Sequence, residues 1–380
     1  MLDRDLCRER IRRFRAELPG GADAAVICRR EHVLWLGNFF PLPNSLNLHG
    51  AGWLVIERDG DVTLFTDNWL GGDMADDPEG TTSADRIVRE TWYDGSGPST
   101  PRVALVADSV RRFLETRKIR RIAAETAYLP QRVAAAVESV VDCEPRILSL
   151  REVKDADELR AIRRGVAVAE AVHRASRELL APGQSEIEYY GQLVARATEE
   201  AGAPFVMMCD LASGERAARG GGPPTSRRLE AGDLVIHDFF PYVDGYRGDI
   251  TNTLVVGGEP TREQEELFAL VRRGLELGES LLGPGRPVSE VAAAVEDLFA
   301  AAGERLIHHT GHAIGLGHPE APEIVRASER TLEEGMVVTL EPGIYGKPGA
   351  PWRGGIRLEH DYLITARGCE RLSHNALGLA

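Results

Sequence analysis

Hydrophobic positions in the first part of the chain repeat with two different periods, which predicts a mixture of strands and helices. Short apolar and β-branched runs predict strands over Ala24–Cys28, Val33–Leu36, Gly52–Ile56, Val62–Phe65, Val103–Ala107 and Arg121–Ala124. Helical spacing predicts helices over Ser109–Glu115 and Gln131–Ser139. We therefore expect an α/β domain over residues 1–150.

A long amphipathic helix is predicted at the start of the second part. Asp155 is a suitable N-cap, and the apolar residues that follow it at helical spacing are Leu159, Ile162, Val166, Ala169 and Val172. The charged stretch Arg151–Lys154 precedes them, so we place a domain boundary near residue 150. The length of 380 residues also favours two domains, the second over residues 151–380.

The second part contains a faint internal repeat. Leu179-Leu180-Ala181-Pro182-Gly183 recurs 102 residues later as Leu281-Leu282-Gly283-Pro284-Gly285. Each copy predicts the end of one helix and the start of another. The predicted limits of the new helices are Ser185 and Gly202 in the first copy, and Ser289 and Gly303 in the second. Strand-like segments with acidic residues follow both copies, so a pseudo-twofold axis would bring the two acidic sets face to face.

Composition excludes several classes of function. The net charge of −14 argues against a nucleic-acid-binding surface. No run approaches the roughly 20 apolar residues that span a bilayer, and the charged N-terminus does not resemble a signal peptide. The cysteines are five in number and show no zinc-ligand spacing: Cys7, Cys28, Cys143, Cys209 and Cys369. We expect a cytoplasmic protein with reduced thiols.

Two acidic residues lie in apolar strands of the first repeat. Asp238 ends the predicted strand 233–238, and Asp249 lies 11 residues later in the segment 245–254, which is predicted to be its hairpin partner. A carboxylate in an apolar β run is costly unless a cation or a partner compensates it. Either residue alone could simply cap a turn.

The second repeat has the same character. Glu341 ends the predicted strand 337–341, and Glu359 lies in the middle of a predicted strand over 355–364. His312, in a glycine-flanked segment, adds an imidazole. A single histidine is more often a core residue than a ligand, and a single glutamate can face solvent at a strand end. The combination favours a metal site.

These stretches resemble the creatinase, aminopeptidase P and prolidase family, which has the pita-bread fold. The matching motifs are Arg151-Glu-Val-Lys154, Gly245-Tyr-Arg-Gly-Asp249-Ile-Thr, Thr310-Gly-His312-Ala-Ile-Gly-Leu316, Glu341-Pro-Gly-Ile-Tyr345 and Gly355-Ile-Arg-Leu-Glu359. Val33-Leu-Trp-Leu-Gly-Asn-Phe39 resembles the early N-terminal domain of prolidases and creatinases. The resemblance implies an α/β N-terminal domain of the creatinase/prolidase type, followed by a pita-bread α+β domain with an internal pseudo-twofold repeat.

The resemblance also implies a dinuclear metal site and a reaction. Its ligands would be Asp238, Asp249, His312, Glu341 and Glu359. Such an oxygen-rich set suits manganese best, with iron, cobalt or zinc as alternatives. The expected activity is that of an Xaa-Pro dipeptidase or aminopeptidase, in which a metal-bridged hydroxide attacks an amide carbonyl.

Further roles follow from the same resemblance. Glu341 would also transfer a proton, and His308 and Arg357 would line the substrate pocket. Arg357 lies two residues before Glu359, so both would share one strand face. The family also implies a homodimer, in which the aromatic and proline-rich loop Phe39–Asn44 would wall the partner's pocket.

The chain departs from the family pattern at two histidines. Peptide-cleaving members place a substrate-facing histidine about 17 residues before the first ligand, where this chain has Gly221. A second one is expected at position 319, which is Pro319, while His318 stands one place earlier and is a candidate replacement. His237 neighbours a ligand but should point to the opposite face, so we interpret it as structural.

These departures leave three hypotheses open. The first is a metal-dependent Xaa-Pro peptidase. The second keeps the metals but acts on a small amino-acid-derived substrate, as a C–N hydrolase resembling ectoine hydrolase or as a lyase resembling dimethylsulfoniopropionate lyase. The third is a pita-bread binding module without catalysis, which the complete ligand set disfavours. A small molecule or a short peptide is the expected substrate in the first two.

Overall fold

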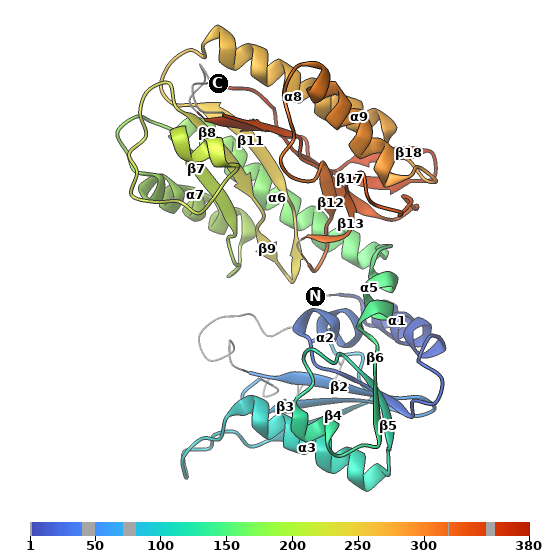
Figure 1. Cartoon of the computed structure of the whole chain (residues 1–380). Coiled ribbons are helices and arrows are strands. Elements are labelled where there is room, and N and C mark those ends of the chain that lie inside the picture. Colours follow the sequence, from blue (N-terminus) through green and yellow to red (C-terminus); the bar gives the residue numbers. More distant parts are fainter. Residues whose placement is uncertain (1, 40–49, 71–80, 318, 347–353) are drawn as a thin grey trace. The chain divides into compact units, whose positions relative to one another are not determined.

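The computed structural model describes residues 2–39, 50–70, 81–317, 319–346 and 354–380. The chain forms two compact units, Met1–Arg151 and Glu152–Ala380. Figure 1 shows both, with the first in blue to green and the second in green to red. None of the described helices is both long and apolar enough to cross a membrane.

The N-terminal unit is built on a six-stranded mixed sheet with the order β4-β3-β2-β1-β5-β6. Its strands are β1 (Ala24–Ile27), β2 (Gly52–Glu57), β3 (Val62–Asp67), β4 (Arg86–Glu90), β5 (Arg121–Ala124) and β6 (Ser139–Asp142). The pairs β1–β2 and β2–β3 are antiparallel, whereas β3–β4, β1–β5 and β5–β6 are parallel. This is the α/β architecture that the alternating periods predicted.

Helices surround this sheet (Figure 1). They are α1 (Arg4–Ala16), α2 (Arg30–Gly37), α3 (Arg102–Arg117), α4 (Gln131–Ala134) and α5 (Glu144–Arg151). Helix α3 buries Val106, Val110 and Leu114, spaced four residues apart, in the core that the sheet residues Val55 and Phe65 also form. This apolar stripe holds the helix on the sheet.

Three predictions for this unit are wrong. Val103–Ala107 is not a strand but lies at the start of α3, because Val106 begins a buried stripe that continues at Val110 and Leu114 with helical spacing. Val33–Leu36 lies in α2, a short helix that is buried all round and therefore has no readable period. The helix predicted over Gln131–Ser139 ends at Ala134, because Ser139 already begins β6 beside β5.

The C-terminal unit contains four sheets, by the pairing of its described residues. One has the order β11-β8-β7, from Ile250–Val255, Leu234–Phe239 and Cys209–Ser213. A second has the order β13-β12-β14-β17-β18, from Glu320–Ile324, Gly311–Ala313, Val337–Leu340, His360–Thr365 and Gly368–Arg371. The two small ribbons are β9–β10 (Tyr242–Val243, Tyr246–Arg247) and β15–β16 (Gly343–Tyr345, Gly355–Arg357). All pairs are antiparallel.

Long helices accompany the sheets. They are α6 (Ala156–Leu179), α7 (Glu186–Ala201), α8 (Arg262–Leu281) and α9 (Val288–Ala301), with a short 3-10 helix η2 (Gly214–Arg219). Helix α6 begins after Asp155, as predicted, with a capping box formed with Glu158. Figure 1 shows α8 and α9 beside each other, on the strands of the second repeat.

The internal repeat is visible in matching backbone hydrogen bonds. Gly183 N donates to Leu229 O at 2.8 Å, and 102 residues later Gly285 N donates to Leu332 O at 2.8 Å. The next pair follows the same rule, since Glu186 N donates to Arg227 O and Val288 N donates to Arg330 O, both at 3.0 Å. Each Pro-Gly turn is therefore hydrogen-bonded to the segment that directly precedes a strand of its own half, β8 in the first copy and β14 in the second.

Three predicted boundaries in this unit are wrong. Helix α9 begins at Val288 with Pro287 as its N-cap rather than at Ser289, since Glu290 N already donates to Pro287 O at 3.1 Å. The segment 245–254 contributes to two sheets, and only its part from Ile250 pairs with β8. The strand predicted over 355–364 is interrupted, so Glu359 lies between β16 and β17.

Candidate metal centre

The three-stranded sheet presents a row of polar side chains. Asp238 on β8 pairs with Thr251 on β11 and with Asp210 on β7, so the three side chains share one face of the sheet. Thr251 Oγ1 donates to Glu359 Oε2 at 2.6 Å. The row therefore connects the carboxylates of the first repeat with one from the second.

Asp249 and Glu359 lie where the two repeats meet. Asp249 directly precedes β11, and its backbone N donates to Asp361 Oδ2 at 3.0 Å. Glu359 N donates to Thr251 O at 2.9 Å, which fixes the break between β16 and β17 against β11. Both side chains are almost completely buried. The break in the predicted strand thus turns Glu359 toward the carboxylates of the other half.

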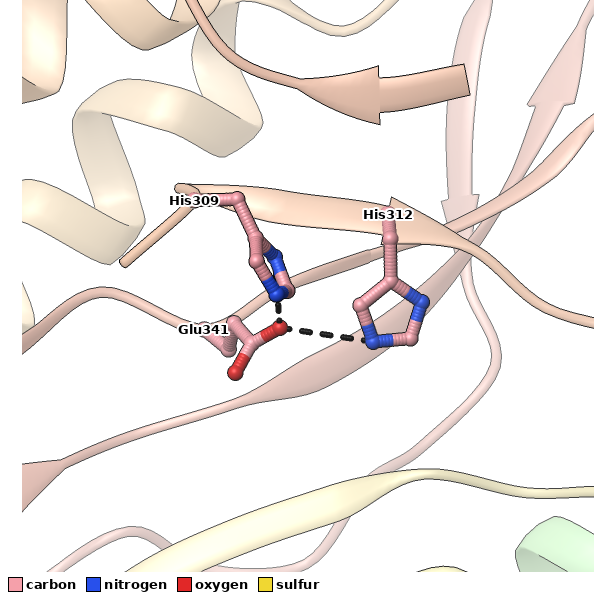
Figure 2. A group of neighbouring side chains, drawn as sticks. All are labelled: His309, His312 and Glu341. Carbon is pink, nitrogen blue, oxygen red and sulfur yellow. Dashed lines mark ion pairs between the residues drawn. The ribbon is translucent and has the colours of Figure 1, made fainter. Parts of the chain in front are cut away.

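His312 and Glu341 complete the group from the five-stranded sheet. His312 lies on β12, next to Gly311. A Cβ at position 311 would collide with the backbone of Thr339 on β14, so only glycine fits there. Glu341 directly follows β14, and its Oε1 lies 3.3 Å from His312 Nε2 and 3.2 Å from His309 Nδ1. Figure 2 shows both imidazoles beside the Glu341 carboxylate.

The distances are short enough for shared ligation of a cation. Candidate ligand atoms of Asp249, His312 and Glu359 lie within 4.8 Å of one another, and so do those of His309, His312 and Glu341. His312 Nδ1 is 2.9 Å from Ala313 O, which favours a proton on Nδ1 and leaves the lone pair of Nε2 toward the carboxylates. A lone pair facing carboxylate oxygens is repulsive unless a cation lies between them.

The electrostatics of the carboxylates lead to the same conclusion. Burial, with Asp238 as the next cause, raises the pKa of Asp249 well above its ordinary value. Burial, with Asp249 as the next cause, likewise raises the pKa of Glu359. Burial opposes ionisation of Glu341 too, but the hydrogen bond from His309 and the charges nearby lower its pKa to about 2. Divalent cations would compensate this excess of buried negative charge.

All these groups line one cleft of about 510 Å³. Asp238, Asp249, His312, Glu341 and Glu359 contribute to its wall. A volume of this size is typical of small-molecule and peptide sites. The residues described around the cleft therefore fit a metal centre that is open to a substrate.

Arg357 supplies a buried positive charge in the cleft wall. Its guanidinium forms an ion pair with Asp238 and donates from Nη1 to Gly220 O at 2.7 Å. His308 also lines the cleft. His308 Nδ1 lies 2.7 Å from His309 O and its Nε2 lies 2.6 Å from Tyr345 Oη, while burial lowers the pKa of His308 to about 4. His308 is thus a neutral imidazole near neutral pH.

Comparison with known proteins gives the family. The model for metallopeptidase family M24 matches residues 160–366. The chain belongs to metallopeptidase family M24. An uncharacterized peptidase of Bacillus subtilis is 32% identical over 283 residues, which cover 72% of this chain and 77% of that protein. An Xaa-Pro dipeptidase of Pyrococcus furiosus is 32% identical over 229 residues, which cover 60% of this chain and 64% of that protein.

Solved structures of similar proteins extend the likeness to the N-terminal unit. An Xaa-Pro dipeptidase from Bacillus anthracis has a TM-score of 0.84 at 26% identity and covers 98% of this chain and 99% of its own. The prolidase from Pyrococcus horikoshii has a TM-score of 0.83 at 25% identity. The match covers 98% of this chain and 100% of the prolidase chain. The resemblance seen in the sequence is confirmed: this M24 chain has the pita-bread fold and is a metallohydrolase of the Xaa-Pro peptidase family.

The positions that depart from the family pattern have distinct surroundings. Gly221 lines the cleft, as does Pro319, whereas His318 lies outside the described residues. His237 is buried away from the cleft lining, where its Nε2 is 2.9 Å from Tyr189 Oη, in keeping with a structural role. Of the loop Phe39–Asn44, only Phe39 is described, and it is buried.

Sequence reasoning missed several residues of this M24 site. His309, Tyr345 and Asp210 contact the predicted site residues, and Asp361 holds the backbone of Asp249. The pair His308-His309 was a readable signal for His309, because two adjacent histidines three and four residues before a ligand are unusual. Asp210 had no such signal, since its role depends on the pairing of β7 with β8.

Proposed function

We propose that this chain is a dinuclear-metal peptidase that hydrolyses the amide bond of short Xaa-Pro peptides. The observation that supports this most is the convergence of five predicted ligands on one cleft in a chain of family M24. The names of its relatives, which include Xaa-Pro dipeptidases, give the substrate class. A cleft of about 510 Å³ is large enough for a dipeptide or tripeptide.

Asp238, Asp249, His312, Glu341 and Glu359 would hold two divalent ions. Four carboxylates and one imidazole favour manganese, with iron, cobalt and zinc as alternatives. When bound, such a pair lowers the pKa of a shared water and polarises the substrate carbonyl. The family is metal-dependent as a class; the identity of the metal in this chain is part of the proposal.

Other residues of the cleft wall would orient the substrate and transfer a proton during its hydrolysis. Glu341, whose pKa lies near 2, is ionised at neutral pH and has His309 within 3.2 Å as a partner for a transferred proton. Arg357 keeps the Asp238 carboxylate in place and borders the cleft, where it can pair with a substrate carboxylate. His308, held by Tyr345, forms a neutral wall beside them. In the same proposal, His318 acts as a further catalytic group.

The test is turnover after metal exchange. The purified protein would be stripped of metal, reloaded with manganese, and assayed on Xaa-Pro dipeptides and tripeptides. Manganese-dependent cleavage that disappears in an Asp249→Ala variant is the expected result. Two ions bound per chain without cleavage of any peptide would contradict the peptidase and direct the search to non-peptide C–N bonds. A chain that binds no divalent ion would contradict both.

The proposal includes association into a cytoplasmic homodimer. Support comes from the family resemblance alone, through the loop Phe39–Asn44. Light scattering coupled to size-exclusion chromatography would measure the mass in solution against the chain mass of 41.5 kDa. A mass near that of one chain at assay concentrations would contradict the dimer.

A further inference from the structure

Asp210 is a carboxylate in the cleft wall that the metal ligand set does not use. It lies on β7 directly opposite Asp238, so two like charges face each other across the strand pair. Among the described residues its only ion pair is with Arg357, whose Nη2 lies 3.7 Å from Asp210 Oδ2. That guanidinium is already engaged by Asp238 and by Gly220 O. Asp210 is therefore weakly compensated by the chain.

Glu186, a buried glutamate in the same unit, provides a comparison, because its carboxylate is fully satisfied by the protein itself. Glu186 is fully buried and accepts hydrogen bonds from Ser213 N, Ser213 Oγ, Thr225 N and Thr225 Oγ1, and it pairs with Arg216. The side chain of Asp210 is 36% exposed, and none of the hydrogen bonds found among the described residues ends on it. Its oxygens are thus open to a molecule in the cleft.

The glycine at the family's histidine position is linked to Asp210. The loop around Gly221 is held on both sides, by the hydrogen bond from Leu211 N to Gly222 O at 2.9 Å and by that from Arg357 to Gly220 O. A Cβ at Gly221 would lie 2.8 Å from Asp210 Cγ and closer still to Oδ2. The backbone at Gly221, with φ of 156°, also disfavours a side chain. Asp210 occupies the space that a histidine there would need.

We propose that Asp210 is a specificity-determining residue that binds a positively charged side chain of the substrate, one that carries an ammonium or guanidinium group, at the wall formed with Gly221. This inference rests on the proposed peptidase function and names its substrate class. A carboxylate accepts hydrogen bonds from such cations, and in a partly water-excluded cleft the interaction is stronger than at an open surface. The same carboxylate repels an anionic group placed there.

The experiment compares matched peptides that differ by one charge. The manganese-loaded enzyme would be assayed on Lys-Pro against norleucine-Pro, and on Ala-Pro-Lys against Ala-Pro-norleucine. In at least one pair we expect kcat/KM to favour the cationic peptide about tenfold, which corresponds to about 1.4 kcal/mol. In Asp210→Asn this preference should fall to about twofold or less. The measured quantity is the ratio within each pair, so a general loss of activity cancels.

A matched control removes a charge from the neighbouring segment. Glu215 is exposed on η2 and does not line the cleft, so Glu215→Gln should keep the wild-type ratio. A wild-type enzyme without any preference, or a preference that persists in Asp210→Asn, would overturn the proposal.

Calorimetric titration with the same peptides separates this proposal from the peptidase function. If the protein cleaves no peptide, the peptides stay intact and their affinities can be measured directly. Tighter binding of the cationic member that is lost in Asp210→Asn would then support the Asp210 site while the peptidase function fails. Equal affinities for both members would refute the Asp210 site.

Discussion

Each of the two units contains a buried group of histidine, carboxylate and arginine, and the two groups differ in charge balance. In the N-terminal unit, Glu125 Oε2 accepts from the backbone N of Cys28 at 2.6 Å and of Arg29 at 2.7 Å, at the start of α2. Arg151 donates to His32 Nε2 at 2.7 Å, so His32 Nδ1 donates to Glu125 Oε1. One carboxylate and one guanidinium thus frame a neutral imidazole.

The group in the C-terminal unit has the same residue types in different numbers. Arg357 is the one arginine buried among the carboxylates Asp238, Asp249, Glu341 and Glu359, as far as the described residues show. Their negative charge exceeds what one guanidinium can balance. A buried cluster whose charges balance needs no ligand and stabilises the fold, whereas a cluster with a large excess of one sign requires counter-ions. Charge balance is therefore what distinguishes a structural cluster from a candidate metal site in this chain.

The largest expected effect concerns the charge-balanced group of His32, Glu125 and Arg151 in the N-terminal unit. Glu125→Ala should lower the free energy of unfolding of the N-terminal unit by about 3–5 kcal/mol, because it leaves a buried histidine and arginine without their carboxylate. Urea unfolding would measure the change. Glu115→Ala, which breaks an exposed pair with Arg111, is the matched control and should cost about 0.5 kcal/mol or less. Equal costs for both variants would contradict a structural role for the Glu125 group.

The second prediction tests the carboxylate cluster of the C-terminal unit. Without metal, removing one of its charges should raise the stability of the protein instead of lowering it. Glu359→Gln should reduce metal-dependent turnover by about 100-fold, because it removes the carboxylate of a proposed ligand. In the presence of a chelator the same variant should melt at a higher temperature than the wild type, since one uncompensated buried charge is gone. The control is Glu370→Gln, which changes an exposed side chain on β18. A lower melting temperature of Glu359→Gln in chelator would refute the idea of excess charge.

The third prediction concerns metal addition. Manganese at about 100 times its dissociation constant should stabilise the wild type by about 2.7 kcal/mol. Glu125→Ala should gain the same amount, because its group is not part of the site, and Glu359→Gln should gain much less. Thermal unfolding with and without manganese would provide the comparison. An unchanged wild-type melting temperature would contradict a metal site.

The smallest effect is a pH dependence that arises from a buried histidine outside both groups. Burial lowers the pKa of His173 to about 4 from its ordinary value of 6.5. Between these values the unfolded chain binds the proton and the folded chain does not, so stability falls as the pH drops from 6.5 toward 4. His173→Gln should therefore make the slope of stability against pH shallower by about 1.4 kcal/mol per pH unit. Urea titrations at pH 7, 6 and 5 would test this, and an unchanged slope would contradict it.

The sequence predicted which side chains would gather in one cleft better than it predicted the helices and strands that carry them. Carboxylates such as Asp238 and Glu359 stand out in apolar strands because burying them is costly, and the internal repeat predicted that the acidic sets of its two halves would face each other. By contrast, α2 and the start of α3 are short apolar runs, for which strand and helix patterns coincide. Asp210 was invisible to sequence reasoning because its neighbours are set by strand register rather than by distance along the chain.

The interruption between β16 and β17 has a consequence for how the C-terminal unit unfolds. It brings Glu359 against Thr251, and Asp361 against the backbone of Asp249, so the candidate ligands straddle the boundary between the two repeats. Bound cations would then act as a reversible cross-link between halves that are also held by hydrogen bonds, apolar packing and the ion pair between Arg357 and Asp238. With the cross-link in place the halves should open together, and amide hydrogens on β11 and on β17 should gain protection from exchange in parallel.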